Sequence, residues 1–315
     1  MKYVFIGDAT YALMLYILYA TDEMLQNTTF FVGNNCGACN LEKKILMSPI
    51  SPYTNKELVR YRIKCLKYRK QLKEAEIFAQ DHVFFAPALI DNLQYNVVED
   101  CPNFFSIREE RKEITFKPTL GALWYNFKVG RIYQRYAGHN PWCKKRIITS
   151  TKDEELFVLK SLPYEKISLQ KLWLNASEYK KKFIENVFSL PSLHSIQKDI
   201  VIFSQPLQED AHLNDEELRN IFLPFVEKFG SENILIKLHP RDKYDYKKAF
   251  PGISTLVTKA PQQLLDIMGL KFKTAITVCS SAVSSLNEDC EIIWLGAEID
   301  ERIVKAYGNI KNPRQ

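Results

Sequence analysis

A chain of 315 residues with 46% hydrophobic and 25% charged residues is long enough for two packed domains and too apolar for a disordered protein. Its formal net charge of +6 suits acidic substrates or an anionic membrane surface. That charge is not a nucleic-acid signature, because no Lys- and Arg-rich run is interleaved with aromatic residues.

The first apolar segment is predicted to fold with the domain rather than to be cleaved or to cross a membrane. Residues 11–20 are almost wholly apolar, but no basic region precedes them and Asp8 interrupts the run. About ten residues are too few to span a bilayer. We therefore expect a strand at 3–6, a helix at 11–25 and a soluble, cytoplasmic protein.

The rest of the first half alternates strand-like and helix-like segments. Strands are expected at residues 29–32, 82–85, 95–98 and 146–150. Helices are expected at 55–79, 123–136 and within 167–190, the first being charge-rich and typical of a solvated surface. Pro191 and the polar run 192–198 then interrupt the pattern, so we place a boundary between domains at 1–190 and 191–315.

The second half repeats the alternation. Strands are expected at 200–203, 234–238, 254–257, 274–278 and 292–295. Helices are expected at 215–229, at 261–268 with Pro261 in the first turn, and after the serines at 280–281. This βαβ rhythm predicts an α/β protein with a parallel sheet in each half. By analogy, two Rossmann-like domains facing a central cleft form the GT-B architecture of many glycosyltransferases.

The cysteines and histidines predict neither disulfides nor a metal site. Seven cysteines, an odd number, do not suggest a disulfide framework. Cys36 and Cys39 form a CxxC without a second pair or a thioredoxin-like context, so a structural or incidental role is expected. The five histidines match no metal signature.

Polar residues follow three of the predicted strands in the second half, where an open α/β sheet binds its ligands. They supply a carboxylate pair, two cations with an imidazole, and hydroxyls at a helix start. The residues are Glu209 and Asp210; Lys237, His239 and Arg241; and Ser280 and Ser281. Together they suit group transfer from a nucleotide donor.

Each of these groups also has a purely structural interpretation. Asp210 would then belong to an acidic surface loop, and Glu99 with Asp100 would cap a helix. Ser280 and Ser281 would likewise be helix caps, and the two glutamines after Pro261 ordinary first-turn residues.

Three motifs in this order resemble the bacterial sialyltransferases of glycosyltransferase family 52, which modify lipooligosaccharides and capsules. They are SQPLQED at 204–210, KLHPRD at 237–242 and CSSAVSSL at 279–286. A weaker match is VEDC at 98–101, where Cys101 stands in place of the glycine of an acidic-acidic-glycine motif.

The resemblance implies an inverting transfer of sialic acid from CMP-sialic acid to a galactose-type hydroxyl, without metal or cofactor. It implies Asp210 as the general base beside Glu209, Asp100 as the alternative base, and His239 at the leaving phosphate. The implied substrate-binding residues are Gln205, Glu209, Lys237, Arg241, Ser280 and Ser281, with Gln262 and Gln263 for the ribose.

Two rival functions stay open at this point. One is a GT-B transferase that uses another nucleotide sugar, such as a UDP-hexose. The other is a non-catalytic nucleotide-sugar-binding protein of capsule assembly. The expected partners are CMP-sialic acid and a galactose-terminated glycan, and no nucleic acid. The sequence leaves the acceptor, the linkage, a peripheral contact with the inner membrane face and a homodimer undecided.

Overall fold

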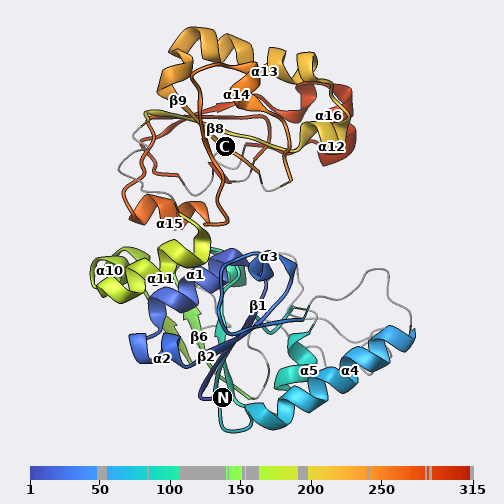
Figure 1. Ribbon diagram of the computed structural model, residues 1–315, viewed down its shortest axis with the longest axis vertical. Helices are drawn as coiled ribbons and strands as arrows, with labels where there is room; N and C mark the ends of the chain where they lie inside the picture. The colour runs from blue at the N-terminus through green and yellow to red at the C-terminus, as the bar shows by residue number, and fades with distance from the viewer. Residues whose placement is uncertain are drawn as a thin grey trace. The chain divides into compact units, whose positions relative to one another are not determined.

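The protein forms two compact units, Met1–Val187 and Phe188–Gln315, each built on one sheet (Figure 1). The computed structural model describes residues 1–47, 55–83, 85–106, 140, 142–150, 153, 163–190, 198–239, 241–280, 282–283 and 286–312. Every strand pair within them is parallel, as predicted. None of their helices has the length and apolarity needed to cross a membrane.

The sheet of the first unit has the order β3-β2-β1-β4-β5-β6-β7. Its strands are β1 (Tyr3–Gly7), β2 (Thr28–Val32), β3 (Lys44–Leu46), β4 (Glu76–Ala79), β5 (Tyr95–Val98), β6 (Cys143–Ile148) and β7 (Tyr164–Lys166). Its described α-helices are α1 (Thr10–Tyr19), α2 (Asp22–Gln26), α3 (Asn34–Gly37), α4 (Asn55–Arg69), α5 (Ala86–Ile90), α10 (Leu169–Leu174) and α11 (Glu178–Phe188). A 3₁₀ turn, η1 (Lys70–Leu72), follows α4.

The structure corrects three predictions in this unit. The helix expected at 11–25 is two helices, because Thr21 caps a new helix by accepting the backbone N–H of Met24. The helix expected at 55–79 ends before β4, a buried strand between β1 and β5. No strand forms at residues 82, 83 and 85, the described part of the strand expected at 82–85: the chain turns there, and Phe85 is buried beside the start of α5. The helix expected at 123–136 lies outside the described residues.

The sheet of the second unit has the order β10-β9-β8-β11-β12. Its strands are β8 (Ile200–Phe203), β9 (Ile234–Lys237), β10 (Ser254–Leu256), β11 (Thr274–Thr277) and β12 (Glu291–Trp294). Its described α-helices are α12 (Leu207–Ala211), α13 (Asp215–Phe229), α14 (Tyr246–Ala249), α15 (Gln262–Ile267) and α16 (Glu301–Tyr307). The sheet is built around β8, whose four apolar residues are all buried.

Local sequence chemistry explains the elements around this sheet. Asn214 and Glu217 form the predicted capping box at the start of α13, which spans the predicted residues. Pro261 is the N-cap of α15 rather than a residue of its first turn. In the described residues after β11, Ala282 and Val283 form a short 3₁₀ turn instead of an α-helix. The predicted domain boundary, residue 190, lies near the division between the two units, and residues 191–197 lie outside the described part.

Candidate active site

Hydrogen bonds link the residues that follow three adjacent strands of the second unit. Because β9, β8 and β11 are parallel neighbours, their carboxyl ends meet at one edge of the sheet. Ser204, after β8, accepts the backbone N–H of His239, after β9, at 3.0 Å. Gln205 accepts the backbone N–H of Cys279, after β11, on Oε1 at 2.9 Å. The three motifs of the sequence are therefore joined at this edge.

Gln205 holds this edge together from the inside. It is 8% exposed, and its Nε2 donates to Cys279 Sγ at 3.0 Å while Oε1 takes the Cys279 amide. Both ends of the Gln205 amide are thus used within the protein. Its predicted contact with substrate stays a prediction, and the role that the geometry gives it is to tie β8 to β11.

His239 is a neutral hydrogen-bond donor. Burial and the nearby Arg241 guanidinium lower the pKa of its imidazole. Nδ1 accepts the backbone N–H of Arg241 at 3.2 Å. A neutral ring that accepts on Nδ1 carries its proton on Nε2. The Nε2–H is then available to donate to an anion at the sheet edge.

Asp210 is held from two sides. Arg241 donates through Nη1 to Oδ1 at 2.8 Å and through Nη2 to Oδ2 at 2.7 Å. Tyr307, on α16, donates its hydroxyl to Oδ2 at 2.8 Å, and α16 packs beside α12 (Figure 1). The hydrogen bonds from Arg241 are the largest cause that lowers the pKa of Asp210. A carboxylate paired in this way is a weak base.

This pair joins two residues with separate predicted roles. The family resemblance implies Asp210 as the base, and it lies on the short helix α12 rather than in a surface loop. Arg241 was expected to hold the substrate anion, and its side chain is 60% exposed, whereas that of Asp210 is 24% exposed. A ligand therefore reaches Arg241 more easily than it reaches Asp210.

Lys237, at the end of β9, is a partly buried cation. Burial lowers its pKa to about 8, and the Asp266 carboxylate partly offsets this shift. Burial in turn raises the pKa of Asp266 to about 6. Gln262 donates Nε2 to Asp266 Oδ1 at 2.8 Å, while its own buried Oε1 has no hydrogen-bond partner within the described residues. Such an acceptor can accept a hydrogen bond from a bound ligand.

The remaining candidates of the second unit are placed as follows. Glu209 Oε2 is buried and has no hydrogen-bond partner in the described part of the chain. Ser280 shapes the turn after β11, because its Oγ accepts the backbone N–H of Ala282 at 3.3 Å. Gln263 is partly exposed on α15. Ser281 lies outside the described residues.

A second polar cluster lies at the carboxyl edge of the sheet in the first unit. Gln80, fully buried after β4, accepts the backbone N–H groups of Asp8 at 2.7 Å and Ala9 at 2.9 Å. Its Nε2 donates to Asp100 Oδ1. The same oxygen lies 3.7 Å from Nε2 of His82. Gln80 thus fixes Asp100, the alternative base, against the ends of β1 and β4.

Asp8 organises the neighbouring loop. Its Oδ1 accepts the backbone N–H groups of Asn35 at 2.8 Å and Cys36 at 3.2 Å, at the start of α3. A Cβ on Gly33 would lie 2.3–2.6 Å from the Asp8 carboxylate, so this approach requires glycine. Cys36 and Cys39 are both buried and not disulfide-bonded. The contact of Cys36 with Asp8 is structural.

Glu99, next to Asp100, is a buried carboxyl group that is largely protonated at neutral pH. Burial raises its pKa to about 8. Its Oε1 accepts from Tyr11 at 3.0 Å and from Thr149, while no described residue forms a hydrogen bond with Oε2. The two adjacent carboxyls therefore differ, since Glu99 is enclosed and the Asp100 side chain is 34% exposed.

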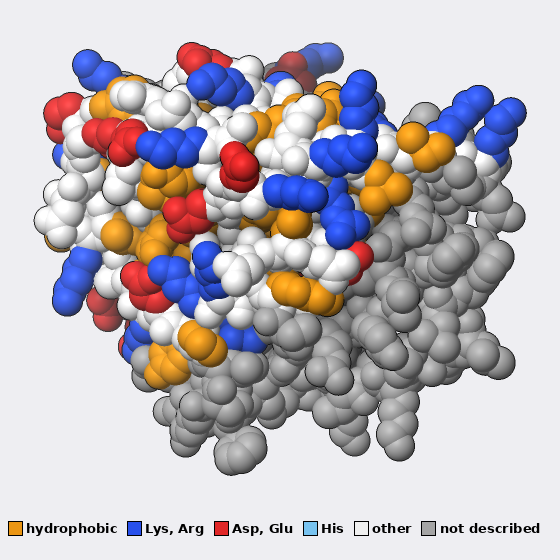
Figure 2. Space-filling model, turned by 90° about the horizontal axis from the view of Figure 1, so that it is seen from below, with side chains coloured by type: hydrophobic (Ala, Val, Ile, Leu, Met, Phe, Trp, Pro, Cys, Tyr) orange, Lys and Arg blue, Asp and Glu red, His pale blue; other side chains and the backbone are white. Residues whose placement is uncertain are grey.

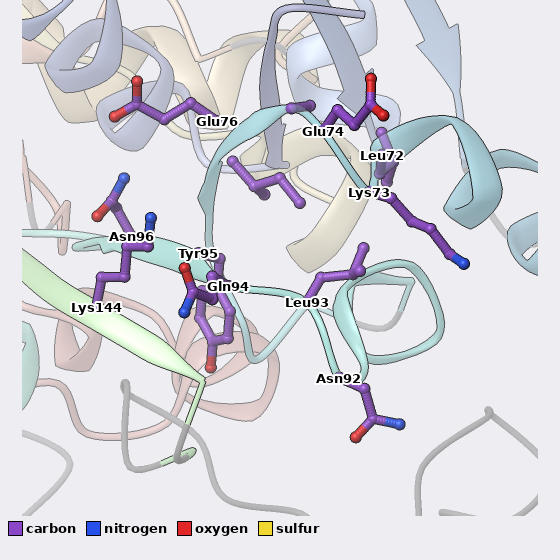
Figure 3. A pocket seen from close by; sticks show the side chains of 12 residues that line it. Leu72, Lys73, Glu74, Glu76, Asn92, Leu93, Gln94, Tyr95, Asn96 and Lys144 are labelled. Carbon is purple, nitrogen blue, oxygen red and sulfur yellow. The ribbon is translucent and has the colours of Figure 1, made fainter.

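A surface pocket of about 480 Å³ lies elsewhere in the first unit (Figure 3). The first residues of β4 and β5, among them Glu76 and Tyr95, line it together with Lys144. These are the amino ends of the strands, whereas ligands of such sheets bind at the carboxyl ends. The pocket is therefore not the candidate active site. In the part of the chain that the structure describes, no group of three His, Cys, Asp or Glu residues could hold a metal ion.

Sequence reasoning missed Gln80, His82 and Tyr307. Gln80 and His82 follow β4, whose residues the sequence pattern predicts as the end of the helix at 55–79. Recognition of the short buried run 76–79 as a strand would have placed both at a carboxyl edge. Tyr307 lies on α16, which was not predicted, and nothing in the sequence connects it with Asp210.

The sequence profile of glycosyltransferase family 52 matches residues 61–293. The chain belongs to glycosyltransferase family 52. An uncharacterised protein of Haemophilus influenzae is 23% identical over 320 residues, which cover 99% of each chain. The predicted resemblance to family 52 is thereby confirmed.

Solved structures of other proteins resemble this family 52 protein in fold. The GT-B domain of a Photobacterium damselae sialyltransferase has a TM-score of 0.55 at 13% identity, with 97% of this chain and 95% of that chain covered. An α/β-galactoside α-2,3-sialyltransferase of Photobacterium phosphoreum has a TM-score of 0.54 at 10% identity, with 98% of both covered.

A third similar structure is the 2,6-sialyltransferase of Photobacterium sp. JT-ISH-224 with CMP and lactose. It has a TM-score of 0.58 at 8% identity, with 93% of this chain and 71% of that chain covered. At these identities the likeness concerns the fold alone. The family 52 protein has the GT-B type of fold that the sequence predicted, with two parallel-sheet α/β domains.

Burial of Glu99 predicts a pH-dependent stability. Its pKa is about 8 in the folded protein against an ordinary 4.5, so the folded state holds the proton more tightly. The free energy of unfolding should therefore fall as the pH rises from 4.5 to 8, by up to roughly 1.4 kcal/mol per pH unit. Urea unfolding at a series of pH values should show a flatter profile for Glu99→Gln. The exposed control Glu216→Gln should keep the wild-type profile, and equal profiles for all three proteins would contradict the assignment.

Proposed function

We propose that this family 52 glycosyltransferase is an inverting sialyltransferase. It transfers sialic acid from CMP-sialic acid to a galactose-type hydroxyl of a bacterial surface glycan, a lipooligosaccharide or a capsular polysaccharide. The observation that carries the proposal is the convergence of His239, Arg241 and Lys237 at one sheet edge. CMP-sialic acid carries a phosphate and a sugar carboxylate, and guanidinium, ammonium and imidazole groups are suited to both anions. The similarity in fold to three sialyltransferases supports the proposal that sialic acid is the transferred sugar.

Nitrogen donors on His239 and Lys237 stabilise the departing CMP in this proposal. The His239 Nε2–H donates to the leaving phosphate oxygen. Lys237 stays charged when the phosphate binds, because a nearby anion opposes the effect of burial on its pKa. Fixed donors aimed at a developing charge provide the electrostatic stabilisation that a metal ion supplies in other transferases. The reaction is therefore proposed to need no metal or cofactor.

Donor binding exchanges the partner of Arg241 in this proposal. The phosphate or sugar carboxylate of the donor takes over the exposed guanidinium and releases Asp210. The pKa of Asp210 then rises, because the Arg241 hydrogen bond is the largest cause of its low value. Tyr307 keeps the carboxylate oriented, and Asp210 accepts the proton of the acceptor hydroxyl as the bond to the anomeric carbon forms. Glu209, Gln262, Gln263 and the two serines at 280–281 are proposed to contact the donor.

Asp100 is the alternative base. Its carboxylate is partly exposed, positioned by Gln80 and free of any ion pair with Lys or Arg among the described residues. If Asp210 serves only to orient Arg241, Asp100 is the group with the chemistry to take the acceptor proton. The assignment of the base to Asp210 and its assignment to Asp100 predict opposite activities for the Asp210→Asn and Asp100→Asn variants.

The first test concerns the donor. Purified protein should transfer sialic acid from CMP-sialic acid to lactose, and it should not use UDP-hexoses. Transfer should continue in excess EDTA. Transfer from a UDP-sugar alone would identify a different glycosyltransferase. Binding of CMP-sialic acid with neither transfer nor hydrolysis would indicate a non-catalytic nucleotide-sugar-binding protein.

The second test separates the two bases. Asp210→Asn should lower kcat by about 10² or more, the range for losing a positioned base, and should leave calorimetric donor affinity within a few-fold. Asp100→Asn should keep measurable transfer. Asp289→Asn, an exposed change of the same kind, serves as the control. An inactive Asp100→Asn enzyme beside an active Asp210→Asn enzyme would move the base to Asp100.

The third test uses the pKa of Lys237. The lysine loses its charge as the pH rises through about 8 in the free protein, while the CMP phosphate is fully ionised above pH 7. CMP affinity should therefore fall between pH 7 and pH 9, by up to about tenfold per pH unit. Calorimetry should show weaker, pH-independent binding for Lys237→Gln. The exposed control Lys273→Gln should behave as wild type, and a flat wild-type profile would contradict the assignment.

A further inference from the structure

The first unit exposes a row of cations on the outer side of α4. Residues 56, 60, 63, 67 and 70 are spaced by four and three positions, which places them along one side of a helix. Four of them are Lys56, Arg60, Lys67 and Lys70, and all are exposed. The fifth, Ile63, lies in the middle and is 62% exposed. We call these five residues the cationic stripe.

The opposite side of α4 faces the core. Cys65 and, in the following 3₁₀ turn, Leu72 are fully buried, and α4 packs on α5. Helical geometry turns the chain by about 100° per residue, so the cationic stripe lies on the side away from Cys65. The stripe is therefore not needed to attach the helix to its own domain.

Cations outnumber acidic residues along α4. Its sequence contains six Lys and Arg residues and one acidic residue, Glu57, whose side chain lies outside the described part. The four cations of the stripe form no ion pair within the described residues. Arg69, outside the stripe, does have a carboxylate partner, Asp91, at 3.7 Å. Figure 2 shows Lys and Arg side chains with apolar ones between them in its right-hand half, on the side where Figure 1 has α4.

An ordinary solvated helix does not explain this combination. Such helices mix both charges, because pairs of opposite sign three or four residues apart stabilise them. Here Ile63 lies between the cations of the stripe, and Leu66, on the flank of the stripe, is 40% exposed. Exposed cations can bind the phosphates of anionic lipids, and exposed apolar side chains beside them can enter the headgroup region. Single-stranded nucleic acid would instead require aromatic stacking side chains, and the stripe has none.

We propose that the cationic stripe is a docking surface for membranes that contain anionic lipids. Lysine and arginine contact the lipid phosphates, while Ile63 and Leu66 enter the boundary between headgroups and acyl chains. The stripe spans 14 residue steps, or about 21 Å, so α4 would lie along the membrane plane. The proposal does not depend on the sugar that the enzyme transfers. Its consequence is an enzyme held at a membrane that carries lipid-linked glycans.

Vesicle sedimentation tests the electrostatic part. The full-length protein should bind phosphatidylcholine vesicles that contain phosphatidylglycerol, and it should not bind phosphatidylcholine alone. Binding should be lost in high salt, since the screening length falls to a few ångströms near 1 M. Replacing Lys56, Arg60, Lys67 and Lys70 by Gln should lower the partition coefficient by about 10² or more.

A matched quadruple variant separates position from total charge. Lys228, Lys243, Lys247 and Lys248 are all exposed in the second unit, and their replacement by Gln removes the same charge. This control should bind vesicles as well as wild type does. Equal losses in both variants would overturn the proposal, because binding would then follow net charge alone. Turnover of a soluble acceptor should be unchanged in the stripe variant, which would show that it is folded.

The apolar part has its own test. Ile63→Ser should weaken binding about tenfold at constant charge, since burial of one such side chain is worth about 1.5 kcal/mol or more. Leu174→Ser, at a 67% exposed position on α10, is the control and should bind normally. Absence of binding to anionic vesicles would overturn the proposal. So would binding to a DNA duplex or to heparin through the same four cations without vesicle binding, which would identify a polyanion surface.

Discussion

Parallel pairing of β8 between β9 and β11 is the constraint on which the candidate site depends. Parallel strands all end at the same edge, so residues 74 positions apart, such as Gln205 and Cys279, come into hydrogen-bond contact there. Apart from Lys237, the last residue of β9, strands β8 and β9 are apolar and buried, and they supply position rather than chemistry. The polar residues just past the strand ends have lost part of their contact with water and bond to one another. Gln205 and Ser204 keep the edge in register, and His239 and Arg241 are presented beyond it.

The balance of charge at this edge decides what the enzyme can do before substrate arrives. Arg241 and Asp210 neutralise each other through two hydrogen bonds, and a carboxylate paired in this way is a weak base. Burial disfavours the charged form of Lys237 and lowers its pKa. An anion that binds beside Lys237 would stabilise the charged form again. The first unit shows the same principle in Glu99 and Asp100, where enclosure keeps one of two adjacent carboxyls protonated.

The sequence predicted the features that depend on local chemistry. The strands at 200–203 and 95–98 and the helix at 215–229 with its Asn214 cap follow from apolar runs and capping residues, which act over a few positions. The prediction that residues 76–79 are helical was wrong. Four residues that follow a charged helix carry no periodicity of their own, and only their pairing with β1 and β5 makes them a strand. The second-half motifs could be found because each directly follows a strand. The contact of Tyr307 with Asp210 joins positions 97 residues apart through helix packing, which no local pattern encodes.

The central claim is that an anion of the donor displaces Asp210 from Arg241 beside His239. A crystal structure of the protein with CMP-sialic acid or an unreactive analogue of it tests this most directly. The account predicts the phosphate within hydrogen-bond distance of His239 Nε2, the Arg241 guanidinium on a donor anion, and Asp210 still bonded to Tyr307. A donor bound away from His239, or an Arg241–Asp210 pair that stays intact with the donor in place, would contradict it.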